Sequence, residues 1–333
     1  MALRTKLCDL LGIEVPIIQA PIGSGSGAQL AAAVSNAGGL GMLSVTWRSI
    51  DELHALLDET QKLTQRPFGI NLVLNWNPAE RLEICLAEGV KIVSFFWGDP
   101  TPYVDRVHRS GALVMQTVGS AEDARTAVAA GVDVVVAQGW EAGGHVWGQV
   151  GSMVLIPAVV DAVGDVPVVA AGGIADGRGI AAALTLGASG VWLGTRFLAS
   201  QEAMVHPLHK EMVVAHAETD TVYGEPFNIG WDNAPHRALR NSTVKRWEAA
   251  GSPMTNRPGA DETVAAYANG TPIVRYGDIM PDPAMTGDLE ALAFYAGQST
   301  GLIHSIEPAA QIVAALVAEA EAVLSGGARM TEK

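Results

Sequence analysis

The residue best placed for chemistry is His145, which ends the segment 138–145 (QGWEAGGH). A β-rich run, 133–137 (DVVVA), comes directly before this segment, so His145 follows the carboxyl end of a predicted strand. Gly143 and Gly144 carry no Cβ, which lets the backbone pass close to a flat ligand. Imidazole titrates near neutrality, and His145 could therefore take a proton from a carbon acid or hydrogen-bond an anion. A lone histidine is more often structural, but this position at a strand's carboxyl end favours a functional role.

Two glycine-rich turns follow later strands and could hold a phosphate. The first is 170–179 (AAGGIADGRG), with Gly172 and Gly173, and the second is 194–197 (GTRF), with Gly194 and Thr195. The glycines leave backbone N–H groups open to an anion, and the threonine hydroxyl can donate a hydrogen bond. Each turn alone could be a tight turn and nothing more. Both together, after strands seven and eight of a βα barrel, predict a phosphate site.

Two arginines in these turns have two interpretations. Arg178 and Arg196 could each neutralise a phosphate, or each could form an ion pair with Asp176 or Glu202. We favour the ion pairs, because exposed arginines are usually solvated or paired.

Amide side chains at other strand ends form a third set of candidates. Gln19, Ala20, Pro21 and Ile22 (QAPI) end the first predicted strand. The remaining amides of this set end the third and fifth strands and are Asn71 and Gln116. An amide both donates and accepts, which suits a heterocycle with mixed edges such as the isoalloxazine ring of a flavin.

The elements that position these residues alternate between short β-rich runs and Ala-rich helices. Strands are predicted at 15–20, 39–44, 68–73, 92–96, 112–117, 133–137, 166–171 and 190–193, with helices between them. The strands are almost continuously apolar, as in parallel sheets covered on both faces. An open dinucleotide-binding sheet should show one early glycine fingerprint, which is missing. The fold class predicted is therefore α/β, a (β/α)₈ TIM barrel with a C-terminal insertion or lid region.

The regular pattern ends after residue 202. Residues 1–218 and 289–333 are predicted to form the barrel with a C-terminal helix at 308–324. Residues 219–288 are rich in Pro, Gly, Asn and Asp, and they are predicted to form an irregular insertion over or beside the barrel mouth. His206, His209 and His216 lack the spacing of a metal site and are predicted to lie on a solvated helix face, so no metal is expected.

Composition excludes several classes of protein. The net charge of −14 disfavours nucleic acid as a partner. The two cysteines, Cys8 and Cys85, cannot form a disulfide framework and are expected to be reduced. No apolar run reaches the ~18 residues of a membrane span. We expect a cytoplasmic enzyme that acts on small molecules, and the sequence allows a homodimer.

Taken together, these motifs resemble those of the nitronate monooxygenases, formerly called 2-nitropropane dioxygenases. The segments that carry the resemblance are QAPI (19–22), GGLG (38–41), FGINL (68–72), QGWEAGGH (138–145), AAGGIADGRGI (170–180), GTRF (194–197) and AGQSTGLI (296–303). The resemblance implies FMN as cofactor and the oxidation of an alkyl nitronate or propionate 3-nitronate with O₂. It implies a catalytic role for His145 beside the flavin and cofactor contacts for Gln138 and Gln298. The glycines of the two turns match phosphate-binding positions.

Other functions stay open at this point. Relatives with a similar barrel and histidine loop include NAD(P)H-dependent FMN reductases, such as NADH:quinone reductases and enoyl-acyl-carrier-protein reductase II. Ile22, Val146 and Trp147 depart from the common pattern of the nitronate monooxygenases. A non-catalytic flavin-binding or phosphate-binding protein is a third interpretation, against which the position of His145 argues. A barrel similar to IMP dehydrogenase is disfavoured, because no cysteine follows the sixth strand.

Overall fold

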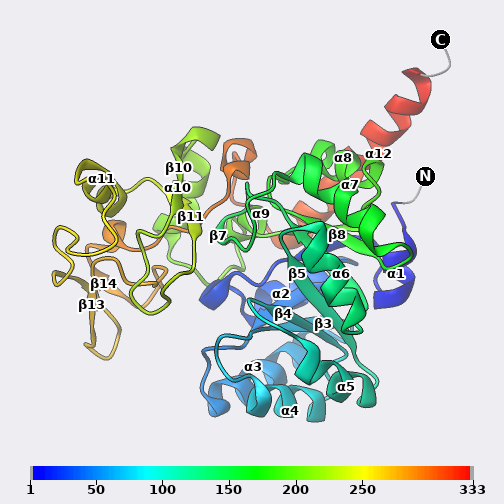
Figure 1. The fold of residues 1–333 in the computed structure, drawn as a ribbon, viewed down its shortest axis with the longest axis horizontal. Coiled ribbons are helices and arrows are strands. Elements are labelled where there is room, and N and C mark those ends of the chain that lie inside the picture. Colours follow the sequence, from blue (N-terminus) through cyan, green and yellow to red (C-terminus); the bar gives the residue numbers. More distant parts are fainter. Residues whose placement is uncertain (1–2, 331–333) are drawn as a thin grey trace.

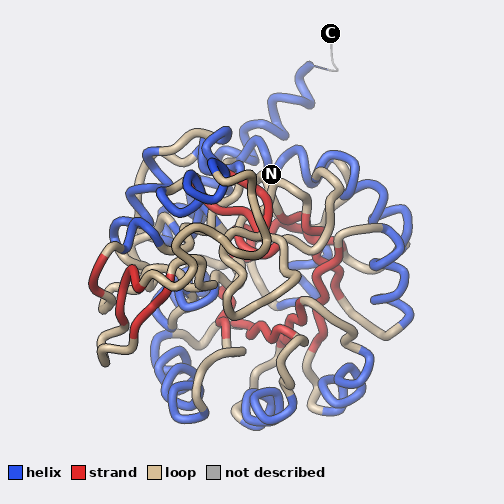
Figure 2. Tube along the Cα trace, turned by 60° about the vertical axis from the view of Figure 1, so that its left-hand side comes forward, coloured by secondary structure: helices blue, strands red, loops and turns tan. Residues whose placement is uncertain are grey.

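The structure is a computed structural model and describes residues 3–330, in which parallel strands form a barrel surrounded by helices (Figures 1 and 2). The barrel strands are β1 (Ile17–Gln19), β2 (Gly41–Ser44), β3 (Phe68–Val73), β4 (Ile92–Phe96), β5 (Leu113–Val118), β6 (Val134–Gln138), β8 (Val168–Ala171) and β9 (Gly190–Leu193). Their order in the sheet is β1-β9-β8-β6-β5-β4-β3-β2, and all the pairs are parallel. A parallel bridge between Ile18 and Leu40 joins the two ends of the sheet. The predicted (β/α)₈ barrel is therefore confirmed.

Helices follow the strands and cover the outside of the barrel (Figure 2). They are α2 (Ala28–Asn36), α3 (Ile50–Leu63), α4 (Ala79–Ala87), α5 (Thr101–Arg109), α6 (Ala121–Ala129), α7 (Ser152–Val163), α8 (Gly177–Thr185) and the short α9 (Thr195–Leu198). Side-chain caps fix where several of them begin. The Ser49 side chain accepts from Glu52 N in a capping box at α3, and Asp176 accepts from Gly179 N at α8.

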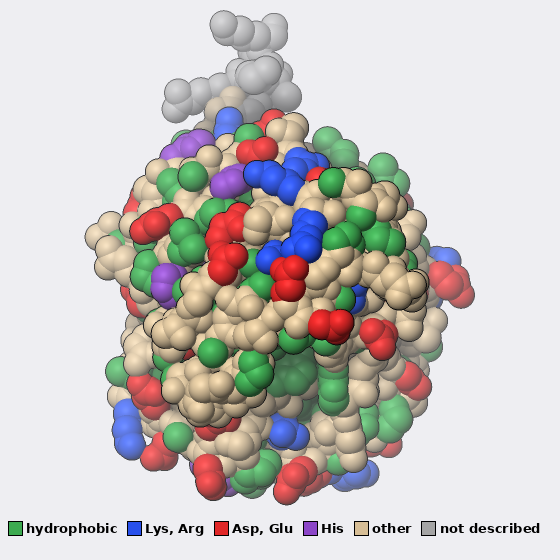
Figure 3. Space-filling view, turned by 90° about the vertical axis from the view of Figure 1, so that its left-hand side faces the viewer, with side chains coloured by type: hydrophobic (Ala, Val, Ile, Leu, Met, Phe, Trp, Pro, Cys, Tyr) green, Lys and Arg blue, Asp and Glu red, His purple; other side chains and the backbone are tan. Residues whose placement is uncertain are grey.

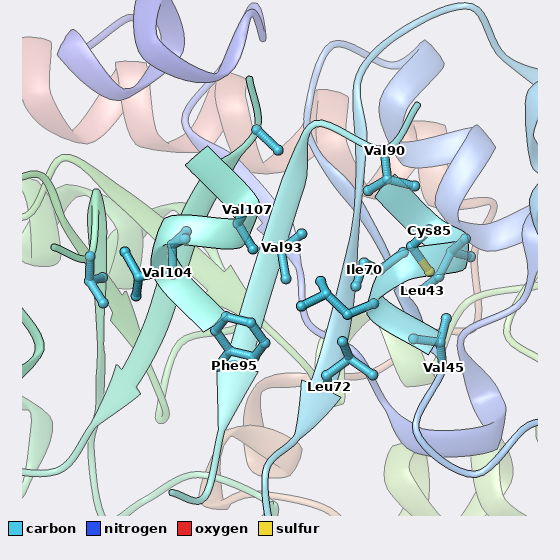
Figure 4. Close-up of a cluster of buried hydrophobic side chains, with 14 of the residues drawn as sticks. Leu43, Val45, Ile70, Leu72, Cys85, Val90, Val93, Phe95, Val104 and Val107 are labelled. Atoms are coloured by element: carbon cyan, nitrogen blue, oxygen red, sulfur yellow. The ribbon is translucent and has the colours of Figure 1, made fainter. Parts of the chain in front are cut away.

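Two hydrophobic layers stabilise the barrel because successive side chains of a strand point to opposite faces. On β4, Ile92 packs inside the barrel with Met115 of the neighbouring strand, while Val93 and Phe95 pack outside against the helices (Figure 4). Helix α1 (Lys6–Leu11) adds its buried residues to the inner layer. Both cysteines are buried and free, Cys8 in the inner layer and Cys85 in the outer one.

The segment after the barrel strands contains more regular structure than its sequence predicts. Helix α10 (Pro207–Ala215) is followed by β10 (Thr221–Gly224), β11 (His236–Leu239), α11 (Ser242–Ala249), β12 (Thr263–Ala266), β13 (Pro272–Val274) and β14 (Thr286–Gly287). These strands form two small antiparallel sheets, and β11 pairs with β7 (Gly144–His145) of the histidine loop. The 219–288 segment therefore contains short regular elements between its loops, which the sequence does not predict because strands of two to four residues are too short to show a period.

The last helix, α12 (Ala309–Met330), packs back onto the barrel as predicted. By length and composition alone, its segment Ala309–Gly326 is long and apolar enough to cross a membrane. The expectation that no apolar run reaches this length is therefore wrong. The carboxylates of α12 contact the barrel instead. Glu319 accepts from Gly177 N at the start of α8, and Glu321 accepts from Leu3 N. The ends of the predicted barrel unit, 1–2 and 331–333, lie outside the described residues.

Two side-chain predictions are corrected and one is confirmed. Arg196 does not pair with Glu202, because its guanidinium is buried and donates to the carbonyls of Ala199 and Ser305. His209 is fully buried, so it does not lie on a solvated face. Arg178 forms the predicted ion pair with Asp176, with 2.8 Å between Nε and Oδ2.

Candidate active site

A cavity of about 900 Å³ lies at the carboxyl ends of the barrel strands. Residues at or after the ends of β1, β3, β6, β8 and β9 line it, and further lining residues come from 229–231, 267–269 and 278–280. On the face that carries the barrel mouth, the surface is hollowed and hydrophobic side chains gather in the hollow (Figure 3). This position matches the rule that βα-barrel sites form from the loops at the carboxyl ends of the strands.

All the predicted site residues line this cavity except Gln19, Gln116 and Gln298. Those that do are Ala20, Pro21, Ile22, Asn71, Gln138, Gly143, Gly144, His145, Gly172, Gly173, Gly194 and Thr195. The Gln116 amide instead donates to the carbonyls of Gly98 and Thr117, and the Gln298 backbone N–H donates to Glu141. Their neighbours Thr117 and Ser299 reach the cavity. The roles of all these residues toward a cofactor stay predictions.

The histidine loop is fixed by contacts from both of its sides. The Gln138 amide donates to the carbonyl of His145 at 3.0 Å and accepts from Trp147 N at 2.9 Å, so Gln138 holds the loop. On the other side, His145 is paired with His236 in the β7–β11 ladder, and Val146 N donates to Pro235. These bonds restrict the His145 backbone, so its side chain has a defined direction.

The imidazole of His145 is buried among aromatic rings, and neither of its nitrogens makes a hydrogen bond with the described residues. Its ring lies 4.0 Å from that of Trp231, at 30° between the planes, and 5.5 Å from that of Tyr295. Nε2 makes no hydrogen bond with the described residues. Burial, and then the nearby His236, hold the pKa of His145 well below its usual range. His145 is therefore neutral at pH 7 and presents an unsatisfied polar atom beside the cavity.

A carboxyl group faces this nitrogen. Asp278 Oδ2 lies 3.9 Å from His145 Nε2, and the Tyr295 hydroxyl donates to Asp278 Oδ1 at 2.6 Å. Burial raises the pKa of Asp278 to about 7, against the opposing effect of the hydrogen bond from Tyr295. Burial and the Asp278 charge hold the pKa of Tyr295 well above its usual range. The three side chains form a largely uncharged polar group in an apolar wall.

The two predicted glycine turns meet at the cavity and present free backbone donors. Gly172 and Gly173 have φ values of 89° and 75°, which favour glycine. Within the described residues, the backbone N–H groups of Gly172, Gly173, Gly194 and Thr195 donate to no protein acceptor. The Thr195 hydroxyl accepts from Gly297 N at 3.0 Å, so its own hydrogen is free for a ligand. Such N–H groups would each lose a hydrogen bond if they were buried without a ligand, and they suit an anionic oxygen.

Tryptophan side chains form another part of the cavity wall. Trp47, Trp76 and Trp231 line the cavity, and Trp76 contacts Trp231 edge to face with 4.8 Å between the ring centroids. Trp97 extends the cluster behind them, 5.1 Å from Trp231 and 5.1 Å from Trp147. We call Trp47, Trp76, Trp97 and Trp231 the tryptophan wall. It offers an apolar surface of inclined rings on which a ring or an alkyl chain can pack.

Sequence reasoning missed Asp278, Tyr295 and the tryptophan wall. Asp278 and Trp231 belong to the segment that was predicted to be irregular, where no strand end marked a functional position. Tyr295 directly precedes the motif AGQSTGLI (296–303), and that adjacency was an available signal. In the part of the chain that the structure describes, no group of three His, Cys, Asp or Glu side chains is arranged to hold a metal ion.

Two buried histidines predict how stability depends on pH. Burial lowers the pKa of His209 and of His236 from 6.5 to about 4. Between pH 4 and 6.5 the unfolded chain binds protons on these histidines that the folded chain does not. The two histidines therefore contribute fully to the free energy of unfolding above pH 6.5, and this contribution is lost as the pH falls toward 4. Each shift corresponds to about 3 kcal/mol. Asp278 acts in the opposite direction over about pH 4–7 and offsets part of this loss.

We therefore expect the melting temperature to fall between pH 6.5 and 4, and expect His209→Asn to make that fall shallower. Calorimetry across this range measures it. The matched control is His54→Asn, because His54 is half exposed on α3 and should leave the slope unchanged. Equal slopes for His209→Asn and the parent protein would contradict the assignment.

The fold and the site together define a (β/α)₈-barrel enzyme with a ligand cavity at the carboxyl ends of its strands and a buried histidine in its wall. The family model "Nitronate monooxygenase" matches residues 4–78 and 75–319. The chain therefore belongs to the nitronate monooxygenase family and is an oxidoreductase.

Similar proteins agree with this assignment. FabK from Thermotoga maritima, whose structure has been solved, is 37% identical in sequence to this chain. The two structures match with a TM-score of 0.84 over 97% of this chain and 98% of FabK. Nitroalkane oxidase from Streptomyces ansochromogenes is 30% identical, with a TM-score of 0.78, over 96% and 99%. A Mycobacterium tuberculosis protein named (3aS,4S,5R,7aS)-5-hydroxy-7a-methyl-1-oxo-octahydro-1H-indene-4-carboxyl-CoA dehydrogenase is 40% identical over 75% of this chain and 70% of its own.

Proposed function

We propose that this chain is an FMN-dependent oxidoreductase that oxidises alkyl nitronates with O₂ to a carbonyl compound and nitrite. In balanced form, two nitronates and one O₂ give two carbonyl compounds and two nitrite ions. The observation that carries the proposal is the neutral His145, whose unpartnered Nε2 lies beside a cavity that also has free phosphate-type donors. Membership of the nitronate monooxygenase family supports the choice of substrate.

The residues of the cavity fit FMN. The free N–H groups of Gly172, Gly173, Gly194 and Thr195, with the Thr195 hydroxyl, would hold the phosphate. The Asn71 amide, which bonds to no other side chain in the described region, is available to the ribityl chain or the ring. A cavity of about 900 Å³ is near the upper end of the usual range for ligand pockets, so a second ligand can bind beside the cofactor.

When bound, FMN supplies the electron acceptor that the protein itself lacks. The chain's own residues bind and orient the substrate. His145 Nε2 can donate a hydrogen bond to a nitronate oxygen when that nitrogen carries the proton, or can take the α-proton of a neutral nitroalkane when it does not. Because His145 stays uncharged, both tautomers are accessible at neutral pH. The tryptophan wall excludes water from one side of the substrate.

Anaerobic mixing with propionate 3-nitronate tests this function directly. We expect the flavin absorbance to bleach on mixing and nitrite to appear once O₂ is admitted. A yellow protein that is not bleached by any nitronate, and that produces no nitrite in air, would overturn the proposal.

The tryptophan wall favours a second candidate function, the flavin-dependent reduction or oxidation of a larger apolar substrate. A small nitronate would leave much of the wall uncovered, whereas a ring system or acyl chain could pack against Trp76 and Trp231. The name of the Mycobacterium tuberculosis relative specifies a bicyclic carboxyl-CoA, which is a substrate of this kind. This candidate includes the NAD(P)H-dependent quinone and enoyl-thioester reductases.

Stopped-flow mixing with NADH and with NADPH distinguishes the two candidates. The flavin of a nitronate monooxygenase should be reduced poorly by either nucleotide. The flavin of a reductase should be bleached within the time of one turnover. Rapid bleaching by one nucleotide, together with no nitrite from nitronates, would favour the second candidate.

A further inference from the structure

Asp278 places a carboxyl group 3.9 Å from His145 Nε2, and it comes from a different part of the chain. His145 lies in the loop after β6, whereas Asp278 follows β13, and both side chains line the same cavity. Their side chains are 10% and 15% exposed. One carboxyl oxygen is bonded to the Tyr295 hydroxyl, and the other points to the His145 nitrogen that has no partner. This arrangement places one carboxyl oxygen beside a buried imidazole nitrogen that has no hydrogen-bond partner in the described residues.

We propose that Asp278 and His145 hold one proton between them and that Asp278 is a second catalytic residue, which transfers a proton to or from the substrate. The inference rests on the proposed function of the site and deepens it. The Oδ2 to Nε2 distance of 3.9 Å exceeds a hydrogen bond by about 1 Å. A polar substrate atom that reaches both groups from the cavity would bridge this gap.

The surroundings favour one shared proton over two charges. Two ions at this depth would each lose solvation, which costs several kcal/mol per ion. Burial raises the pKa of Asp278 to about 7 and lowers that of His145, so below pH 7 a carboxylic acid faces a neutral imidazole. The other titratable groups near Asp278 or in the same cavity are Tyr295, His236, Tyr267, Asp282, Arg48 and Glu52. Tyr295 is the one among them that bonds to the carboxyl group.

The proton has a defined course in the reaction. With a neutral nitroalkane, the α C–H bond breaks, the proton passes to the Asp278–His145 pair, and the electron pair stays on the substrate as a nitronate. This step needs Asp278 ionised, because the pair must have room for the proton. A nitronate that is supplied ready-made is an anion, and it binds better beside a protonated, neutral Asp278. The two substrate forms should therefore respond to pH in opposite directions.

The alternative is that Asp278 is structural and only orients Tyr295. The pH dependence of kcat/KM separates the two roles, with nitroethane and ethyl nitronate as substrates between pH 5.5 and 9. We expect kcat/KM for nitroethane to rise about tenfold per pH unit below pH 7 and then to level, as for a single titrating base. The value of kcat/KM for ethyl nitronate should instead fall above pH 7.

Three variants complete the test, each checked for retained flavin and melting temperature. Asp278→Asn should abolish both inflections and lower kcat/KM for nitroethane by about 10²-fold. Asp278→Glu should restore part of that activity together with its inflection. Tyr295→Phe should move the inflection to higher pH, because the hydrogen bond from Tyr295 lowers the pKa of Asp278. Unchanged pH profiles in Asp278→Asn would overturn the proposal.

An infrared titration provides a readout that does not depend on turnover. The C=O stretch of a protonated buried carboxyl group should disappear as the pH rises through about 7, and Asp278→Asn should lack this band. If the band titrates but neither substrate is turned over, the shared proton stands and the proposed function fails. If nitronates are oxidised but no band titrates near 7, the role of Asp278 is wrong while the proposed function stands.

Discussion

His145→Asn is expected to lower kcat/KM for a neutral nitroalkane by about 10²–10⁴-fold, the usual contribution of a general base. Asparagine keeps a polar side chain of similar reach, but its amide cannot take up a proton near neutral pH. With a ready-made nitronate the loss should be smaller, because the amide can still donate a hydrogen bond to the anion. Steady-state kinetics with both substrate forms, on flavin-replete protein, measure the difference.

The matched control for this variant is His54→Asn, at a half-exposed histidine on α3. This control should leave kcat/KM unchanged for both substrate forms. Turnover of both substrate forms by His145→Asn at the parent rate would show that His145 has no part in proton transfer or anion binding. An equal loss for both forms would show that its main contribution is a hydrogen bond to the anion.

The barrel half of the site could be predicted because of a general property of parallel barrels. Every strand delivers its carboxyl end to the same mouth, so a residue such as Asn71 or Gly172 is placed as soon as its strand is recognised. The apolar runs are long enough for this: the predicted strands 68–73, 92–96 and 190–193 have the observed bounds. The location of most cavity-lining residues could therefore be predicted from the sequence.

Individual side-chain roles were less predictable, because they depend on which partner is nearest in space. Gln138 lines the cavity as expected, but its spacing in the sequence does not show that both ends of its amide bond to the histidine loop. Glu202 was expected to pair with Arg196, yet its carboxylate accepts from Ala309 N at the start of α12. In both cases the observed partner is a backbone group, brought near by tertiary packing that leaves no trace in local spacing.

The sequence predicts that the insertion lies over or beside the barrel mouth, but not which of its residues reach the site. Its contribution depends on β11, which pairs with the two-residue strand β7 and so brings the 219–288 segment against the histidine loop. That pairing places Trp231 on the His145 ring and brings Asp278 within 3.9 Å of Nε2. We propose that the segment is part of the catalytic site in addition to covering it. Sequence differences within it would then change the reaction while the barrel stays the same.

Gly143→Ala is expected to release most of the flavin and to lower activity by about 10²-fold, the scale of a 1 Å misplacement of a catalytic group. A Cβ at this position would lie 2.2 Å from Gly297 N and 2.4 Å from the Ala296 carbonyl carbon. Both of these are backbone atoms, and neither can rotate away as the end of a side chain could. The histidine loop must therefore separate from the 296–298 segment, which moves His145.

Gly151→Ala is the matched control for that variant, since Gly151 lies between the same loop and α7. Its φ of −65° suits any residue, and its nearest contact would be the Glu141 carboxylate at an ordinary 3.5 Å. Flavin absorbance after gel filtration and nitronate turnover should match the parent protein in Gly151→Ala and be lost in Gly143→Ala. Retention of flavin and activity by Gly143→Ala would mean that the two segments can separate without moving the site. His145 would then owe its position to Gln138 and the β7–β11 ladder alone.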